Sequence, residues 1–180
     1  GASTGGPTAI QRLLESIQNG ISVPILVCQH MPRAFTSVFA QRLNMLLDYH
    51  VKEAEDDDVL CNRTVYVCPG NRHMEVAEGK LRLYDAGRTD LYTPSVDRLF
   101  SSAATSYREK LIAIVLTGMG KDGAEGVKSV AKRGGTVIAE SAETSIIHGM
   151  PKAAIATGCG AEVIPLDRIG TRIMEVATRS

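Results

Sequence analysis

The chain has 180 residues, 44% of them hydrophobic, which suits one globular domain with a single sizeable core. Its 20 Lys and Arg balance its 20 Asp and Glu, and this zero net charge argues against a nucleic-acid or anionic-membrane surface, which needs a basic excess. No apolar run approaches the roughly 20 residues that span a bilayer. We therefore expect one domain over residues 1–180, with no nucleic acid bound and no membrane insertion.

Apolar runs of strand length alternate with segments of helical periodicity, which indicates βα units and a parallel sheet. We expect an α/β fold, doubly wound, with a mostly parallel sheet flanked by helices. In chain order, the predicted helices cover residues 7–19, 35–47, 95–107, 122–133, 151–157 and 166–178. The predicted strands cover residues 24–29, 64–68, 111–116, 136–139 and 162–164.

Residues 73–85 follow a different pattern. Apolar and polar side chains alternate there on both sides of Glu78 and Gly79, which predicts one antiparallel hairpin. The dense acidic cluster over residues 53–58 is expected to be a solvated loop.

The cysteines show no CxxC spacing and no regular framework; they are Cys28, Cys61, Cys68 and Cys159. Cys28 and Cys68 fall inside predicted strands, where a free thiol packs as a small hydrophobe. A chain of this length can build a core without disulfides, so we expect a reduced, cytoplasmic protein.

Parallel α/β sheets place their chemistry in loops beyond the carboxyl ends of the strands. Ser3 lies in a glycine-rich opening segment, His30 follows the strand predicted over residues 24–29, and Asp122 lies in a glycine-rich loop after the strand predicted over 111–116. Serine hydrolysis needs this set of side chains. A neutral imidazole takes the proton of the attacking hydroxyl, and a carboxylate orients the imidazole and stabilises the imidazolium that forms.

Each of the three residues also has an ordinary interpretation. Ser3 could belong to a phosphate-binding loop, although neither GxGxxG nor GxxxxGK[ST] is present. Asp122 could cap the helix that follows it, with Glu125 completing a capping box. His30 could be a structural loop histidine. Position alone leaves these interpretations about as good as the catalytic one.

Two further residues are candidates for holding the oxyanion or the substrate. The turn that contains Met119 could aim the amide of that residue at a developing oxyanion, or its side chain could simply pack. The hydroxyl of Thr4 could orient the histidine or the substrate, or could bond its own backbone. The four histidines lie far apart, without HExxH or paired Cys/His spacing, so we expect no metal site.

At this point the sequence carries a resemblance over essentially its whole length. The motifs that carry it are, in order, GASTGGP, QHMP, PGNRHM, PSVDRLFSSAA, LTGMGKDGA and HGMPKAA. In this order they resemble the catalytic domain of the bacterial chemotaxis protein-glutamate methylesterases. The combination is specific, because the opening loop and LTGMGxDGA occur together with the intervening motifs at matching positions.

The resemblance implies a serine hydrolase that removes methyl groups from γ-glutamyl methyl esters on the cytoplasmic helices of methyl-accepting chemoreceptors, releasing methanol, for adaptation in chemotaxis. It also implies deamidation of receptor glutamines and no metal or organic cofactor. By motif, the nucleophile is Ser3, the base is His30 and the carboxylate is Asp122.

The sequence departs from the family pattern in three ways. Members carry an apolar strand directly before the opening loop and usually a regulatory receiver domain ahead of that, and we expect neither within residues 1–180. Glu140 stands where similar proteins commonly have Gln, which could alter the polarity of the cleft. Two other interpretations remain: an interaction module of this fold that has lost catalysis, and a nucleotide-binding protein that uses GASTGG as its phosphate loop.

Overall fold

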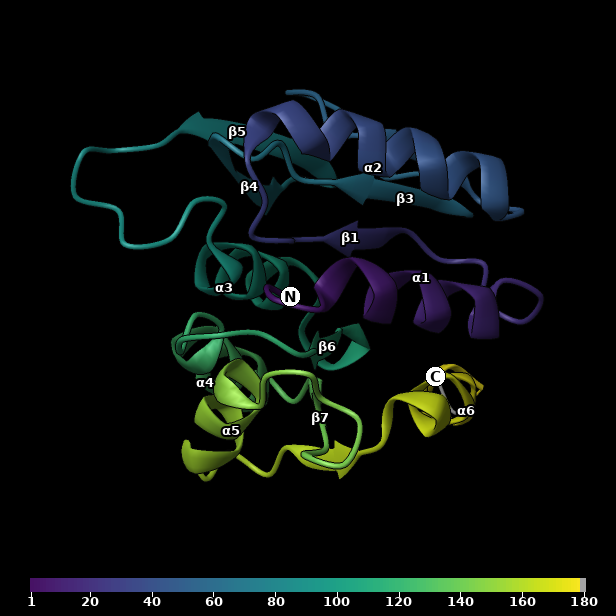
Figure 1. Cartoon of the computed structure of the whole chain (residues 1–180), viewed down its shortest axis with the longest axis vertical. Helices are drawn as coiled ribbons and strands as arrows, with labels where there is room; N and C mark the ends of the chain where they lie inside the picture. The colour runs from purple at the N-terminus through teal and green to yellow at the C-terminus, as the bar shows by residue number, and fades with distance from the viewer. Residues whose placement is uncertain (179–180) are drawn as a thin grey trace.

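The computed structural model describes residues 1–178 as an α/β arrangement of helices around parallel strands (Figure 1). Its helices are α1 (Gly6–Ile17), α2 (Arg33–Leu46), α3 (Val96–Tyr107), α4 (Ala124–Lys132), α5 (Gly149–Ala156) and α6 (Leu166–Ala177), with a 3₁₀ turn at Arg108–Lys110. Its strands are β1 (Ile25–Val27), β2 (His50–Glu53), β3 (Thr64–Val67), β4 (Arg72–Ala77), β5 (Lys80–Asp85), β6 (Ile112–Val115), β7 (Thr136–Glu140) and β8 (Glu162–Ile164).

The parallel strands form two groups, in the orders β1-β3-β2 and β6-β7-β8, and the opening residues join them. Ala2 bonds the backbone of Cys28 and His30 on one side, at 3.0 Å each. The flanking Gly1 and Ser3 bond the backbone at the end of β6 on the other side. The strands are therefore added on opposite sides of the opening segment, and the strand order reverses beside Ser3. Open α/β sheets bind their ligands in the crevice at such a reversal.

Successive strand residues point into two separate cores, as a sheet covered on both faces requires. Val65 and Val67 of β3 face the core that contains α1, α2 and α6. Tyr66 and Cys68 face the core formed by α3, α4, α5 and the hairpin. This arrangement confirms the predicted doubly wound fold with helices on both faces of the sheet.

The antiparallel hairpin predicted over residues 73–85 is confirmed. Strands β4 and β5 pair in register from Arg72 with Asp85 to Ala77 with Lys80, which leaves Glu78 and Gly79 as the two-residue turn. The hairpin packs against α3 and shares a core with the face of β3 that carries Tyr66 (Figure 1).

One strand was missed and one helix begins later than expected. Strand β2 lies at the edge of its group and buries only Val51, so its four residues carry too little apolar pattern to be told from the acidic loop that follows. Helix α4 was expected to begin at Asp122 but begins at Ala124, with Gly123 as its N-cap. Among the described residues, no helix is both long and apolar enough to cross a membrane.

Candidate active site

Ser3 sits in a sharp turn between the opening extended segment and the first helix. The chain passes from Ser3 through Gly5, whose φ of 81° is in the left-handed region that favours glycine, and α1 begins at the next residue. The amide of Gly6 donates to the Ser3 carbonyl at 2.8 Å and closes the turn. The hydroxyl-bearing residue therefore stands just before a helix N-terminus, where the helix dipole favours developing negative charge.

Gln29 ties the serine loop to the histidine loop, a role that sequence reasoning missed. Its side chain is only 2% exposed, and its Nε2 donates to the carbonyls of Ser3 and His30 at 2.9 and 3.0 Å. A glutamine at the end of an otherwise apolar strand was the available signal, because a buried amide needs partners.

His30 and Asp122 form a close pair between loops 92 residues apart in the chain. The distance from His30 Nε2 to Asp122 Oδ2 is 2.7 Å, and the two side chains are 14% and 1% exposed. The structure thus brings together two of the three residues predicted to act in catalysis, at hydrogen-bonding distance.

Asp122 also caps a helix, but not the one that the capping-box interpretation names. Its Oδ2 accepts the amide of Val96 at 2.7 Å and its Oδ1 accepts the amide of Asp97 at 3.0 Å, at the start of α3. The hydroxyl of Ser95 donates to the same carboxylate at 3.3 Å. The capping box with Glu125 is wrong, because Gly123 occupies the N-cap of α4 and it is Asp97 Oδ1 that accepts an amide in the first turn, that of Gly126 at 2.7 Å.

These donors fix the charge of the carboxylate. Burial by itself raises the pKa of Asp122, but hydrogen bonds from His30 and from the amides of Val96 and Asp97 outweigh burial and hold that pKa below its ordinary value. An ionised carboxylate only accepts hydrogen bonds, so the proton of the neutral imidazole must lie on Nε2. The lone pair of His30 is then on Nδ1.

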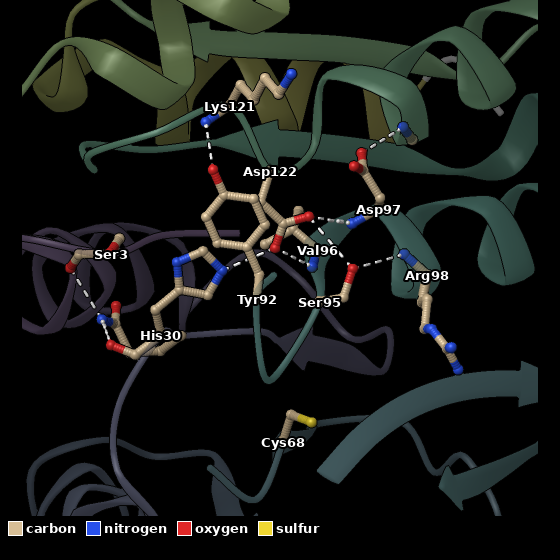
Figure 2. A network of polar contacts seen from close by, with 12 residues as sticks. Ser3, His30, Cys68, Tyr92, Ser95, Val96, Asp97, Arg98, Lys121 and Asp122 are labelled. Atoms are coloured by element: carbon tan, nitrogen blue, oxygen red, sulfur yellow. Dashed lines mark hydrogen bonds and ion pairs between the residues drawn. The ribbon is translucent and has the colours of Figure 1, made fainter. Parts of the chain in front are cut away.

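Ser3 lies on the side of the imidazole away from Asp122, so the ring stands between the hydroxyl-bearing residue and the carboxylate (Figure 2). The backbones are adjacent, since the amide of His30 donates to the carbonyl of Ala2 at 3.0 Å. Within residues 1–178 the Ser3 hydroxyl makes no hydrogen bond to the ring. Such contacts are often long in an enzyme without substrate and tighten in the Michaelis complex.

The loop after β6 packs directly on the serine. A Cβ at Gly118 would lie 2.8 Å from the Cβ and 2.9 Å from the amide nitrogen of Ser3, so only glycine fits at this close approach. The next residue, Met119, has a side chain that is 65% exposed, so the packing alternative for Met119 is wrong. Its amide has no hydrogen-bond partner within the described chain and remains a candidate oxyanion donor.

Thr4 makes neither of the contacts considered for it. Its side chain is exposed, and among residues 1–178 its hydroxyl bonds neither the histidine nor its own backbone. Its carbonyl instead accepts the hydroxyl of Thr117 at 2.9 Å, which joins the serine loop to the loop after β6.

Glu140 is completely buried below this second loop. Its Oε2 accepts the amide of Thr117 at 2.7 Å and its Oε1 accepts the hydroxyl of Thr144 at 2.9 Å. The carbonyl of Thr117 in turn accepts the amide of Ser3. The buried Glu140 carboxyl group therefore supports the serine loop through Thr117 and does not line an open cleft. No group of three or more potential metal ligands occurs in the part of the chain that the structure describes.

Comparisons with known proteins agree on one family. The CheB methylesterase family profile matches residues 1–173. The chain is 49% identical to a protein-glutamate methylesterase/protein-glutamine glutaminase of Myxococcus xanthus over 99% of this chain and 53% of that protein. It is 42% identical to one of Vibrio parahaemolyticus over 97% of this chain and 48% of that protein. The chain thus spans about half the length of the curated relatives it matches.

A solved structure supports the same assignment. The catalytic domain of the Thermotoga maritima CheB methylesterase superposes with a TM-score of 0.90 and 38% sequence identity, covering 97% of this chain and 95% of that one.

Proposed function

Because the chain belongs to the CheB methylesterase family, we propose that it hydrolyses γ-glutamyl methyl esters of chemoreceptor proteins and releases methanol. In this proposal Ser3 is the nucleophile, His30 the general base and Asp122 the orienting carboxylate. The observation that carries the assignment of residues is the 2.7 Å contact between His30 and Asp122 at the strand ends, with Ser3 on the opposite side of the ring.

The reaction begins with attack of Ser3 Oγ on the ester carbonyl. His30 Nδ1 accepts the hydroxyl proton, and the Asp122 carboxylate stabilises the imidazolium through Nε2. The amide of Met119 holds the oxyanion, and the N-terminus of α1 favours the negative charge beside Ser3. The tetrahedral intermediate then expels methoxide, which takes the proton from His30 and leaves as methanol.

Water completes the cycle by the same route. His30 removes a proton from water, which attacks the acyl-enzyme, and the proton then passes to Ser3 Oγ as the glutamate is released. A receptor glutamine reacts identically, with ammonia in place of methanol. The names of the relatives include protein-glutamine glutaminase, which supports this second activity.

In the same proposal, the substrates are the cytoplasmic helices of methyl-accepting chemoreceptors. A receiver domain outside these residues regulates the activity. The curated relatives are about twice as long as this chain, which leaves room in them for such a domain.

Methanol release from methylated receptor tests the proposal. We expect release by the wild type and loss of at least about 10³-fold in Ser3→Ala. Ser22→Ala is the matched control, because Ser22 is exposed and lies outside the site. Full activity of Ser3→Ala would refute the assigned nucleophile.

A second measurement separates the enzyme from a docking module of the same fold. A fluorophosphonate should label the wild type at Ser3 and leave Ser3→Ala unlabelled, because only an activated serine reacts at a useful rate. Receptor binding without methanol release and without labelling would favour the docking module.

A further inference from the structure

An aromatic ring covers one face of the proposed base. Tyr92 stacks on His30 with ring centroids 5.2 Å apart and an angle of 7° between the planes (Figure 2). Tyr92 is partly buried and lies on the segment between β5 and α3, which sequence reasoning treated only as a connection. Tertiary contacts therefore position the ring, and no sequence motif predicts them.

The hydroxyl end of Tyr92 faces the turn after β6 (Figure 2). A Cβ at Gly120 would lie 2.7 Å from the hydroxyl oxygen and 3.2 Å from Cε1 of Tyr92, so the missing side chain leaves room for the ring. The amide of Lys121 donates weakly to the same hydroxyl at 3.4 Å. Tyr92 thus contacts the imidazole with its ring face and, with its hydroxyl end, the turn that carries the candidate oxyanion amide.

A second histidine–aspartate pair anchors the segment on both sides of Tyr92. His73, which is completely buried on β4, contacts Asp90 Oδ2 through Nε2 at 2.7 Å. Its Nδ1 accepts the amide of Ser95 at 3.2 Å. The amide of Gly87 also donates to Asp90, at 2.7 Å, and these bonds from Gly87 and His73 hold the pKa of Asp90 below its ordinary value.

We infer that Tyr92 is a positioning residue for the His30 base, and that the His73–Asp90 pair, here called the clasp, holds Tyr92 in place. The inference rests on the proposed function. Rotation of the imidazole about its Cβ–Cγ bond would turn Nε2 away from Asp122 and Nδ1 away from Ser3, and so break the order of serine, ring and carboxylate. A parallel ring against one face blocks that rotation, and its π face also attracts the imidazolium formed during attack.

Kinetics of methanol release test the role of the ring. Tyr92→Leu should lower kcat by about 10- to 100-fold while KM changes by less than about threefold, because the base is misaligned but the substrate still binds. Tyr92→Phe, which keeps the ring, should retain kcat within about threefold. Leu91→Ala is the matched control, since Leu91 is 87% exposed on the same segment.

Spectra of the histidine rings give a readout that needs no activity. In protein labelled with ¹⁵N-histidine and assigned with His30→Gln, the His30 ring protons should be shielded by Tyr92 and its nitrogens should report a fixed Nε2–H tautomer. Both signatures should persist in Tyr92→Phe and be lost in Tyr92→Leu. If the spectra respond in this way but the wild type releases no methanol, the proposed function fails and the positioning role stands.

A double-mutant cycle between Asp90 and Tyr92 tests whether the clasp acts through the Tyr92 ring. Asp90→Ala should lower kcat in the same direction as Tyr92→Leu, and it should add less than about twofold when combined with that change, because both act through one ring. Additive effects would overturn the clasp. A Tyr92→Leu protein with wild-type kcat and an unchanged His30 spectrum would overturn the positioning role itself.

Discussion

Asp122 accepts the backbone amide of Val96 at 2.7 Å. Val96 is the first residue of α3, whereas Asp122 precedes α4 in the chain. The same oxygen contacts His30 Nε2, so one carboxylate both caps α3 and orients the proposed base. The orientation of the proposed base and the capping of α3 therefore depend on the same buried carboxylate.

Replacing Asp122 with Asn should disable the proposed base, while the remaining oxygen can still accept an amide at the start of α3. If the amide nitrogen of the new side chain faces His30, it donates to Nε2 and forces the ring proton onto Nδ1, where it blocks transfer from Ser3. We expect kcat for methanol release to fall by about 10³–10⁴-fold. Asp167→Asn, an exposed change in the first turn of α6, is the control and should keep full activity. A small loss in Asp122→Asn would contradict the orienting role.

The same carboxylate should make stability depend on acid. Its folded-state pKa lies below the ordinary value of 3.8, so its contribution is present above 3.8 and is lost as the pH falls through the folded-state pKa. In urea unfolding, the difference in free energy between the wild type and Asp122→Asn should narrow from pH 5 to pH 3. A difference that widens over that range would contradict the direction of the shift.

Gly118→Ala should damage the site by steric overlap. The added Cβ would lie 2.8 Å from Ser3 Cβ and would also overlap Met150 Sδ, so the serine loop must move. Overpacking of this kind costs about 1–3 kcal/mol of stability, and misplacing the proposed nucleophile Ser3 should lower kcat at least about tenfold. Gly20→Ala is the control, because its Cβ meets only the flexible Met174 side chain. Wild-type kcat in Gly118→Ala would contradict this prediction and show that the serine loop accommodates the added Cβ without displacing Ser3.

Glu140→Ala should destabilise the protein by leaving the buried Thr117 amide without an acceptor, a loss of about 1–3 kcal/mol in urea unfolding. Glu140→Gln should lose less, because its amide oxygen can still accept that hydrogen bond. The exposed Glu143→Ala is the control. Equal losses in the Ala and Gln variants would mean that the carboxylate charge, rather than the acceptor, supports the loop.

The buried thiols should resist alkylation in the folded protein. Burial raises the pKa of Cys68 to about 12 and that of Cys28 well above its ordinary value, so neither forms thiolate at pH 8. Mass spectrometry after iodoacetamide treatment should find Cys61, which is exposed, labelled first, and all four cysteines labelled in urea. Native labelling of Cys68 as fast as Cys61 would contradict its burial.

The sequence determined the alternation of strands and helices, because apolar periodicity records which side chains must leave water, and it determined the hairpin by its turn residues. It could not reveal β2, whose single buried side chain leaves no pattern. The family motifs indicated Ser3, His30 and Asp122, whereas their positions in loops at strand ends left other interpretations about as good.

Only the tertiary structure decided how these residues are held. The capping of α3 by Asp122, the bridge made by Gln29 and the stack of Tyr92 on His30 all join segments that are at least 25 residues apart or lie on different elements. A local pattern in the chain encodes the preference of one segment for helix, strand or turn. Contacts between segments depend on how the sheet sets its strand ends side by side, and that order is a property of the packed molecule.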